Sequence, residues 1–450
     1  MLEQHGLIVI SALLLAYGLF SRLLSRGIVT GQMVFLGAGL AFGFVAERTN
    51  QITLSSTVGV DLLVRVFGEI ALIVLLFTDA ARIDLRALRR DLAMPARMLG
   101  IGMPLMIAIG MTAAWLLFPQ FGVWELALLA AILAPTDAAL SHAVVSSDVV
   151  PLRVRQALCV ESGLNDGLAV PLILFFAWMA SVAGPESMPD SPYHSFPGAM
   201  RFASLQLLLG LIAGVAIGGL GAKCLDHSIR REWIDGAFCA LSGVSLALLA
   251  AIGAEHLGGN AFIAAYVGGL TFGNLSRRST ETMADFAEPE GILLMLLTFF
   301  LVGVMFVEEA LASVTWEIAI YAVLSLVGVR MIAVSVSLLG LRTSLETRIF
   351  LGWFGPRGLA SALFGLLLLE GLTVPHSDLL FAVVMLTVVL SVMLHGATSA
   401  PLARWYATRL DSAECAAAQR PCRELSYRTR HRLSKRHVDA IHTELVPPAY

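Results

Sequence analysis

The chain has 450 residues, of which 57% are hydrophobic and only 14% are charged, and its formal net charge is −3. Its mean hydropathy is +0.80. A chain of this length with so few polar side chains cannot solvate the outside of a globule, so the composition excludes a soluble protein and indicates a polytopic membrane protein. The five cysteines lie far apart and show no metal-ligand spacing, which predicts free thiols and no metal centre.

Apolar runs recur along the chain at lengths near the roughly 20 residues that an α-helix needs to cross a bilayer. They predict an all-α polytopic membrane protein with about thirteen transmembrane helices. The runs lie at residues 6–21, 28–46, 66–83, 97–118, 123–146, 155–183, 201–225, 235–255, 259–275, 291–308, 316–340, 348–371 and 377–400. We therefore expect a transmembrane domain over residues 1–401 and a separate tail over residues 402–450.

Basic residues are distributed unequally between the two sides of the predicted membrane domain. The loops after odd-numbered spans carry nearly all of them, whereas the opposite side has only Arg48, Arg65 and Arg201. Because cytoplasmic loops are enriched in Lys and Arg, this asymmetry predicts an external N-terminus and a cytoplasmic C-terminus. The arginine-rich tail over residues 402–450 is typical of a solvated cytoplasmic segment held near anionic lipid by charge, and a regulatory role for it is also open.

Two carboxylates interrupt the sixth span, within the octet VESGLNDG at residues 160–167. A charge inside the bilayer costs on the order of 3 kcal/mol or more unless it is paired or hydrated, so such residues usually mark an ion or proton pathway. On a helix, Glu161 shares a face with Asn165, and Ser162 shares the adjacent face with Asp166. A structural helix contact would need only one hydroxyl or amide, so the octet predicts a functional site.

Helix breakers occur in comparable places in two other spans. In span five, Pro135 cannot donate a backbone hydrogen bond, so we expect Thr136 and Asp137 to lie in a local unwinding; a plain proline kink is the alternative. In span twelve, the run GWFGPRG over residues 352–358 predicts a second break. Interrupted helices at corresponding places in two halves indicate an inverted-repeat transporter with its binding site near the middle of the membrane.

Three further charged residues lie within predicted spans. Arg357 follows the break in span twelve and requires an acidic partner, for which Glu161 is our prediction among the buried carboxylates. Arg330 in span eleven must also be paired, but the sequence does not identify its partner. Asp79, near the cytoplasmic end of span three, is either an ion-entry carboxylate or an end residue whose side chain extends to the interface.

Five sequence runs together resemble one family of membrane proteins. The runs LLFTDAARID, LAPTDAALS, RQALCVESGLNDGLAVP, GGNAFIAAYVGGL and GWFGPRGLASAL, in this order, closely resemble the monovalent cation:proton antiporters of the NhaP and sodium/proton exchanger branch. The resemblance covers roughly residues 5–400. It implies thirteen spans in two inverted repeats, a dimerisation domain, a core that moves like an elevator, a homodimer, and a place in the lipid bilayer of the bacterial inner membrane.

The resemblance also implies roles for the polar residues of spans five and six. Asp166 looks like the carboxylate that binds the cation and the proton in turn, and Asn165 matches the amide beside it. Ser162 matches a side-chain ligand, and Thr136 with Asp137 matches the unwound segment that contributes oxygens or orders water. Asp166, Ser162 and Thr136 would therefore hold the transported alkali cation, which is cargo and not a resident metal.

Glu161 with Arg357 resembles the family's structural ion pair, and Asp79 corresponds to an acidic position of span three that we expect at an ion entry. In one respect the chain departs from the pattern. Many members have proline directly after the Thr-Asp pair, whereas this chain has Ala138, so the unwinding would depend on Pro135 alone.

These features predict a secondary active transporter that exchanges Na⁺, or else Li⁺ or K⁺, for H⁺. Asn165 cannot titrate and a paired Glu161 stays ionised, which leaves Asp166 as the mobile proton site and predicts electroneutral one-for-one exchange. We see no nucleotide loop, nucleophile triad or metal cluster, and so expect no enzyme activity, no cofactor and no nucleic-acid partner. Three alternatives stay open: an electrogenic antiporter in which Asp79 or Asp137 carries a second proton, a cation channel, and a non-transporting sensor.

Overall fold

The computed structural model describes most of the predicted membrane domain. The described residues are 2–24, 28–48, 58–81, 83, 85, 93–137, 140, 144, 150–183, 196–276, 291–304, 313–341, 343–370 and 374–409. Their main helices are α1 (Leu2–Leu24), α2 (Gly31–Arg48), α3 (Val58–Ala81), α5 (Ala93–Arg97), the π-helix η2 (Met98–Gly102), α6 (Met103–Leu117), α7 (Val123–Ile132), α9 (Leu152–Ala183), α10 (Phe196–Arg230), α11 (Gly236–His256), α12 (Ala261–Leu275), α14 (Trp316–Val323), the π-helix η5 (Leu324–Val329), α15 (Arg330–Ser337), α16 (Leu345–Trp353), α17 (Leu359–Glu370) and α18 (Ser377–Arg409).

The structure confirms the all-helical fold class, since no strand occurs among these residues. Each predicted span overlaps a helix, including a further one over Gly291–Val304. Helix α18 continues to Arg409, and the rest of the predicted tail lies outside the described residues. Five helical segments are long and apolar enough to cross a membrane unaided: Ala93–Leu117, Arg153–Ser181, Ser204–Arg230, Trp316–Ser337 and Ser377–Arg409.

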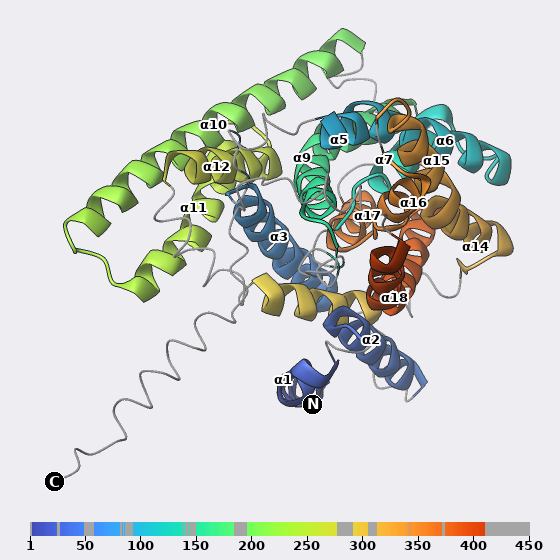
Figure 1. Cartoon of the computed structure of the whole chain (residues 1–450), viewed down its shortest axis with the longest axis horizontal. Helices are drawn as coiled ribbons and strands as arrows, with labels where there is room; N and C mark the ends of the chain where they lie inside the picture. Colours follow the sequence, from blue (N-terminus) through green and yellow to red (C-terminus); the bar gives the residue numbers. More distant parts are fainter. Residues whose placement is uncertain are drawn as a thin grey trace.

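Most of the helices form two packed groups, which leave out α1, α2 and the helix over Gly291–Val304. The scaffold group consists of α3, α10, α11 and α12, in which α12 contacts each of the other three. The core group consists of α5 to α7, α9 and α14 to α18 with the two π-helices. In Figure 1, α11 and α12 lie on one side of α3, and α9 and α17 lie on the other. Helix α9 also contacts α3, α10 and α12, so it lies where the two groups meet.

The outer face of α10 carries apolar side chains that no other part of the described chain covers. Its exposed residues include Leu205, Leu208, Leu211, Ile212 and Val215. A soluble protein rarely exposes such a continuous apolar surface, whereas hydrocarbon-facing helices require one. The pattern agrees with a helix in contact with lipid or with another apolar surface.

The core group repeats one order of helix types. A helix containing a π-helical turn comes first (α5–η2–α6 and α14–η5–α15), an interrupted helix follows, and a long helix with an internal proline comes last (α9 with Pro171 and α18 with Pro401). The breaks fall where the sequence predicts them. Helix α7 ends at Ile132 before the non-helical residues 133–137, and residues 354–358 separate α16 from α17. The chain is unwound at Pro135, so the alternative of a plain proline kink is wrong.

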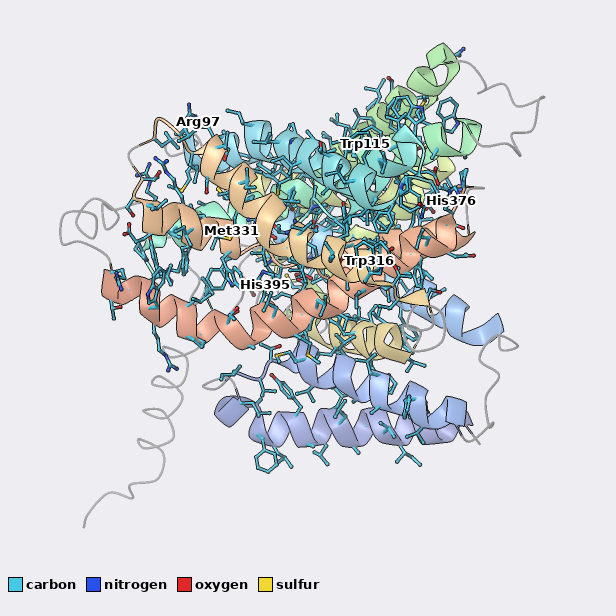
Figure 2. The ribbon with its side chains drawn as sticks, turned by 90° about the vertical axis from the view of Figure 1, so that its right-hand side faces the viewer. Arg97, Trp115, Trp316, Met331, His376 and His395 are labelled. Carbon is cyan, nitrogen blue, oxygen red and sulfur yellow. The ribbon has the colours of Figure 1, made fainter. Side chains whose placement is uncertain are left out.

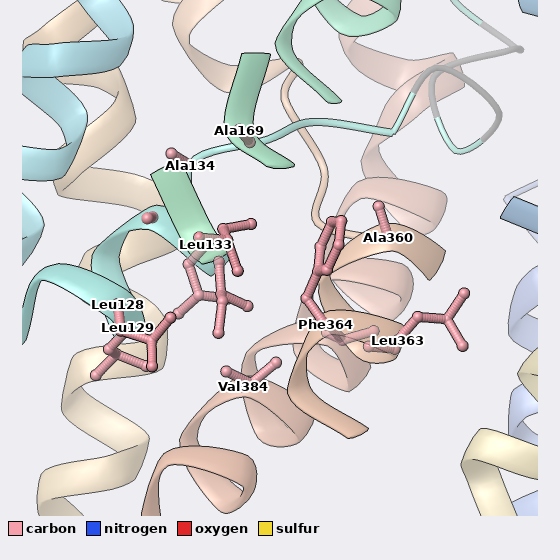
Figure 3. Packing of buried hydrophobic residues seen from close by; sticks show 14 of the residues in the cluster. Leu128, Leu129, Leu133, Ala134, Ala169, Ala360, Leu363, Phe364 and Val384 are labelled. Carbon is pink, nitrogen blue, oxygen red and sulfur yellow. The ribbon is translucent and has the colours of Figure 1, made fainter. Parts of the chain in front are cut away.

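Apolar packing fixes the inner ends of the interrupted helices. Figure 3 shows Leu133, just after α7, facing Phe364 of α17, with Val384 of α18 below them. All three side chains are buried in one cluster that also contains Leu128 and Leu363. Lipid tails are as apolar as leucine, so close van der Waals packing rather than exclusion of water stabilises such a contact inside a membrane. The packing holds the two non-helical segments in a defined position.

Candidate functional site

The two non-helical segments pass each other and exchange hydrogen bonds. The backbone N–H of Asp137 donates to the carbonyl of Pro356 at 2.8 Å, and one carboxylate oxygen of Asp137 accepts the N–H of Leu359 at 3.1 Å. Leu359 is the first residue of α17, so this carboxylate lies at the positive end of a helix dipole. A β-carbon at residue 358 would overlap the Asp137 side chain, so the approach requires Gly358.

The carbonyl end of α7 is stabilised by a cation, whereas the N–H end of α17 is stabilised by an anion. Nε of Arg357 donates to the carbonyl of Leu133 at 2.6 Å, and Oγ of Ser361 donates to the carbonyl of Ile132 at 2.8 Å. Arg357 also donates to the carbonyl of Gly355. A helix that stops inside a bilayer leaves carbonyls that no water can satisfy, and a cation there also complements the helix dipole. Arg357 therefore stabilises the helix break by donating hydrogen bonds to its free carbonyls.

The buried partner of Glu161 is Arg330, so the prediction that Arg357 pairs with Glu161 is wrong. Nη1 of Arg330 lies 2.7 Å from Oε1 of Glu161, and Nη2 lies 2.8 Å from Oε2. The side chains are 0% and 1% exposed. Arg357 is committed to the carbonyls at the break, whereas Arg330, the residue directly after η5, reaches α9. The two-point geometry is the strongest that an arginine and a carboxylate can form.

Arg330 also satisfies the other interrupted helix. Its Nη2 lies 3.3 Å from the carbonyls of both Leu351 and Phe354, at the carbonyl end of α16. The carbonyl ends of the two interrupted helices thus each have one arginine as a hydrogen-bond donor: Arg357 for α7 and Arg330 for α16. The sequence requires a partner for Arg330, and the structure identifies it.

Helix α9 contacts the unwound segment through the two polar faces that the octet predicts. Oγ of Ser162 donates to the carbonyl of Thr136, and the Asn165 amide donates to the Thr136 hydroxyl at 2.7 Å. All three residues are buried. The structure therefore brings Thr136, Ser162 and Asn165 together, directly beside Asp166.

Asp166 is half-buried, and its Oδ1 is a buried atom without a hydrogen-bond partner among the described residues. Oδ1 of Asn165 is in the same condition. Asp137 and Asp79 interact electrostatically with Asp166, which places the acidic position of α3 near the same site. The result is a carboxylate with one unused oxygen, next in sequence to the Asn165 amide that contacts Thr136.

This set of atoms suits a monovalent cation. Amide, carbonyl and hydroxyl oxygens can replace the hydration shell of an alkali ion, and a single nearby carboxylate supplies the charge. Within the described part of the chain, no group of three or more His, Cys, Asp or Glu side chains is arranged to hold a metal ion. The cluster therefore offers one carboxylate charge and neutral oxygens, which is the kind of donor set that suits an alkali cation.

Sequence reasoning missed two residues that support the break in span twelve. Oγ of Ser391 in α18 accepts the backbone N–H of Arg357 at 2.6 Å. One turn later, Nε2 of His395 lies 3.0 Å from the carbonyl of Trp353. Both belong to the last span, where their spacing of four residues is the only signal that could have indicated a shared face.

We predict that Glu161 and Arg330 stabilise the protein only as a pair. Glu161→Gln or Arg330→Met alone leaves a buried charge without its partner, and each should lower the free energy of unfolding by about 3–5 kcal/mol. The double variant should recover part of that loss, as measured by thermal unfolding in detergent. Arg404→Gln, at an exposed position, is the control. Additive losses in the double-mutant cycle would contradict the pairing.

Three comparisons with known proteins agree with this geometry. Residues 9–405 match the family model described as sodium/hydrogen exchanger, transmembrane. The K(+)/H(+) antiporter NhaP of Alkalimonas amylolytica is 27% identical over 345 residues, which are 75% of this chain and 57% of that protein. The Na(+)/H(+) antiporter of Schizosaccharomyces pombe is 24% identical over 267 residues, which are 55% of this chain and 54% of that protein. The chain thus spans little more than half the length of these curated relatives.

A solved structure has the same fold. The sodium proton antiporter MjNhaP1 from Methanocaldococcus jannaschii superposes with a TM-score of 0.72 at 19% identity, over 90% of this chain and 100% of that one. The helix breaks and the family match over nearly the whole described region lead to one conclusion. The chain belongs to the sodium/hydrogen exchanger family of integral membrane proteins.

Proposed function

We propose that the chain is a secondary active transporter that exchanges a monovalent alkali cation for protons. The observation that carries this proposal is the unused buried oxygen of Asp166 beside the Thr136, Ser162 and Asn165 cluster. Membership of the exchanger family and the antiporter names of the relatives support it.

The mechanism is competition for one carboxylate. Ionised Asp166 binds a dehydrated cation together with the neutral oxygens around it. Protonated Asp166 has no charge to attract the cation, so the site can cross the membrane without metal. An ionised and unloaded Asp166 would carry an uncompensated charge through the apolar interface, and the cost of desolvating that charge prevents an empty crossing. Cation movement in one direction is thereby coupled to proton movement in the other.

The core group moves as one body against the scaffold group in this proposal, as in an elevator. The contacts of Arg330 with Glu161 and α16, and of Arg357 with Leu133, lie within the core group. They would travel with the site and would not need to break. The exposed apolar face of α10 lies on the scaffold group and suits the contact between two copies in a homodimer.

Electroneutral one-for-one exchange follows from the remaining acids. Both carboxylate oxygens of Glu161 are bound by Arg330, so Glu161 is committed to a buried ion pair. Asp137 uses a carboxylate oxygen to cap the N-terminal end of α17. Asp166 then remains as the carrier of the proton. The electrogenic alternative has one supporting observation, which is that Asp79 and Asp137 interact electrostatically with Asp166.

We also propose a plasma-membrane location with an external N-terminus and a cytoplasmic C-terminus. In Figure 2, Arg97 lies at the end of the molecule where α18 finishes, and His376, just before α18 begins, lies at the opposite end. Arg404 and Arg409 are exposed at that finishing end of α18. These three arginines lie at one end, which the positive-inside rule assigns to the cytoplasm.

Asp166→Asn should abolish cation-driven proton movement in proteoliposomes while the protein remains folded in detergent size-exclusion. The substitution keeps the volume of the side chain but removes the group that alternates between charged and neutral forms. Glu255→Gln, at an exposed position in α11, is the matched loss of a carboxylate and should retain exchange. Near-normal exchange by Asp166→Asn would overturn the proposal. A panel of Li⁺, Na⁺ and K⁺ with the unmodified protein identifies the cargo.

Exchange should also be insensitive to membrane potential. Proteoliposomes are held at constant pH and cation gradients and are given a diffusion potential. For Na⁺ or Li⁺ exchange the potential is set with valinomycin and K⁺. For K⁺ exchange it is set with a gradient of a membrane-permeant lipophilic ion that carries no protons. One proton for one cation moves no net charge, so the rate should stay the same. A clear change of rate with voltage would show that a second acid is recruited, and conduction without a proton gradient would favour a channel.

A further inference from the structure

Tyr266 of α12 lies against the α9 residue next to Asp166. A β-carbon at residue 167 would lie 2.9 Å from Cδ1 and 3.0 Å from Cγ of the Tyr266 ring, closer than such atoms approach, so the contact requires Gly167. Tyr266 is 9% exposed. It comes from the scaffold group, whereas Asp166 belongs to the core group. The ring is therefore held where the two groups meet, at the level of the binding carboxylate.

Three buried oxygens are left without hydrogen-bond partners among the described residues of this region. They are Oη of Tyr266, Oδ1 of Asp166 and Oδ1 of Asn165. Buried polar atoms are nearly always paired, and unpaired ones call for an explanation in terms of function. The phenol of Tyr266 and the carboxylate of Asp166 interact electrostatically. A ligand at Asp166 that also reached the Tyr266 hydroxyl would satisfy both of these oxygens.

We infer that Tyr266 contributes its hydroxyl oxygen to the transported cation at Asp166, from the scaffold side of the site. The inference rests on the proposed function and deepens it. A dehydrated alkali ion needs several oxygens to replace its water, and the core group offers them from one side. A phenolic hydroxyl can accept as well as donate a hydrogen bond, so its lone pairs are available to a cation without adding charge.

The position of Tyr266 in the scaffold group limits its contact with the cation to one position of the core group relative to the scaffold group. The core oxygens travel with Asp166, but Tyr266 belongs to α12 and contacts α9 only where the two groups meet as they do here. Tyr266 would then raise cation affinity when the site faces one side of the membrane and not when it faces the other. It is a binding residue that also affects the choice among alkali ions, because that choice depends on the number and positions of the oxygens.

Tyr266→Phe removes this oxygen and keeps the ring. In proteoliposomes it should raise the apparent KM for the preferred cation about five- to tenfold and change the ranking of Li⁺, Na⁺ and K⁺, with the maximal rate within about twofold of the unmodified protein. Tyr321→Phe is the matched control. Its hydroxyl lies 3.3 Å from the carbonyl of Gly110, and its ring packs on Phe118, so the KM should not change.

Gly167→Ala provides an independent variant because it displaces the ring while every core oxygen remains. It should raise the KM in the same direction, and the double variant with Tyr266→Phe should be no worse than the more affected single one, since both remove the same contact. An unchanged KM and cation ranking in Tyr266→Phe would overturn the assignment of Tyr266 alone. Absence of exchange by the unmodified protein with every alkali cation would overturn the proposed function, and the inference with it.

Discussion

Two helices stop inside the membrane, and the backbone groups exposed at their ends constrain the rest of the structure. Water is not available there, so each free N–H and C=O needs a partner from the protein. Arg357 serves the carbonyl end of α7, Arg330 that of α16, and Asp137 the N–H end of α17. These three charged side chains, which lie in predicted spans, therefore stabilise the ends of the interrupted helices.

This division of roles leaves Asp166, among the described acids of the site, with an unused buried oxygen. Glu161 and Arg330 neutralise each other at two points, and a buried pair of this kind fixes an arrangement more than it adds stability. The neutral polar groups of Thr136, Ser162 and Asn165 hold α9 to the unwound segment through hydrogen bonds. An ion at Asp166 would thus bind beside a hydrogen-bonded frame in which Glu161 and Arg330 already neutralise each other.

Much of this arrangement could be predicted from the sequence because it depends on local chemistry. Hydropathy indicates the spans, Pro135 indicates the unwinding, and the helical period of α9 places Ser162 and Asn165 on the faces that contact Thr136. The partner of Glu161 could not be predicted, because two arginines are available and only the position of Arg330 at the start of α15 decides between them. Tyr266 was missed for a similar reason, since its approach depends on the fit between its ring and Gly167.

The central claim is that a cation and a proton compete for Asp166. The most direct test is calorimetric titration of the detergent-purified protein with the transported cation, repeated in buffers that differ in ionisation enthalpy to count the protons released. The account predicts the release of up to about one proton per bound cation, with a fraction that falls as the pH rises and Asp166 becomes ionised. It also predicts no binding by Asp166→Asn. Cation binding without proton release at any pH, or binding of equal affinity by Asp166→Asn, would contradict it.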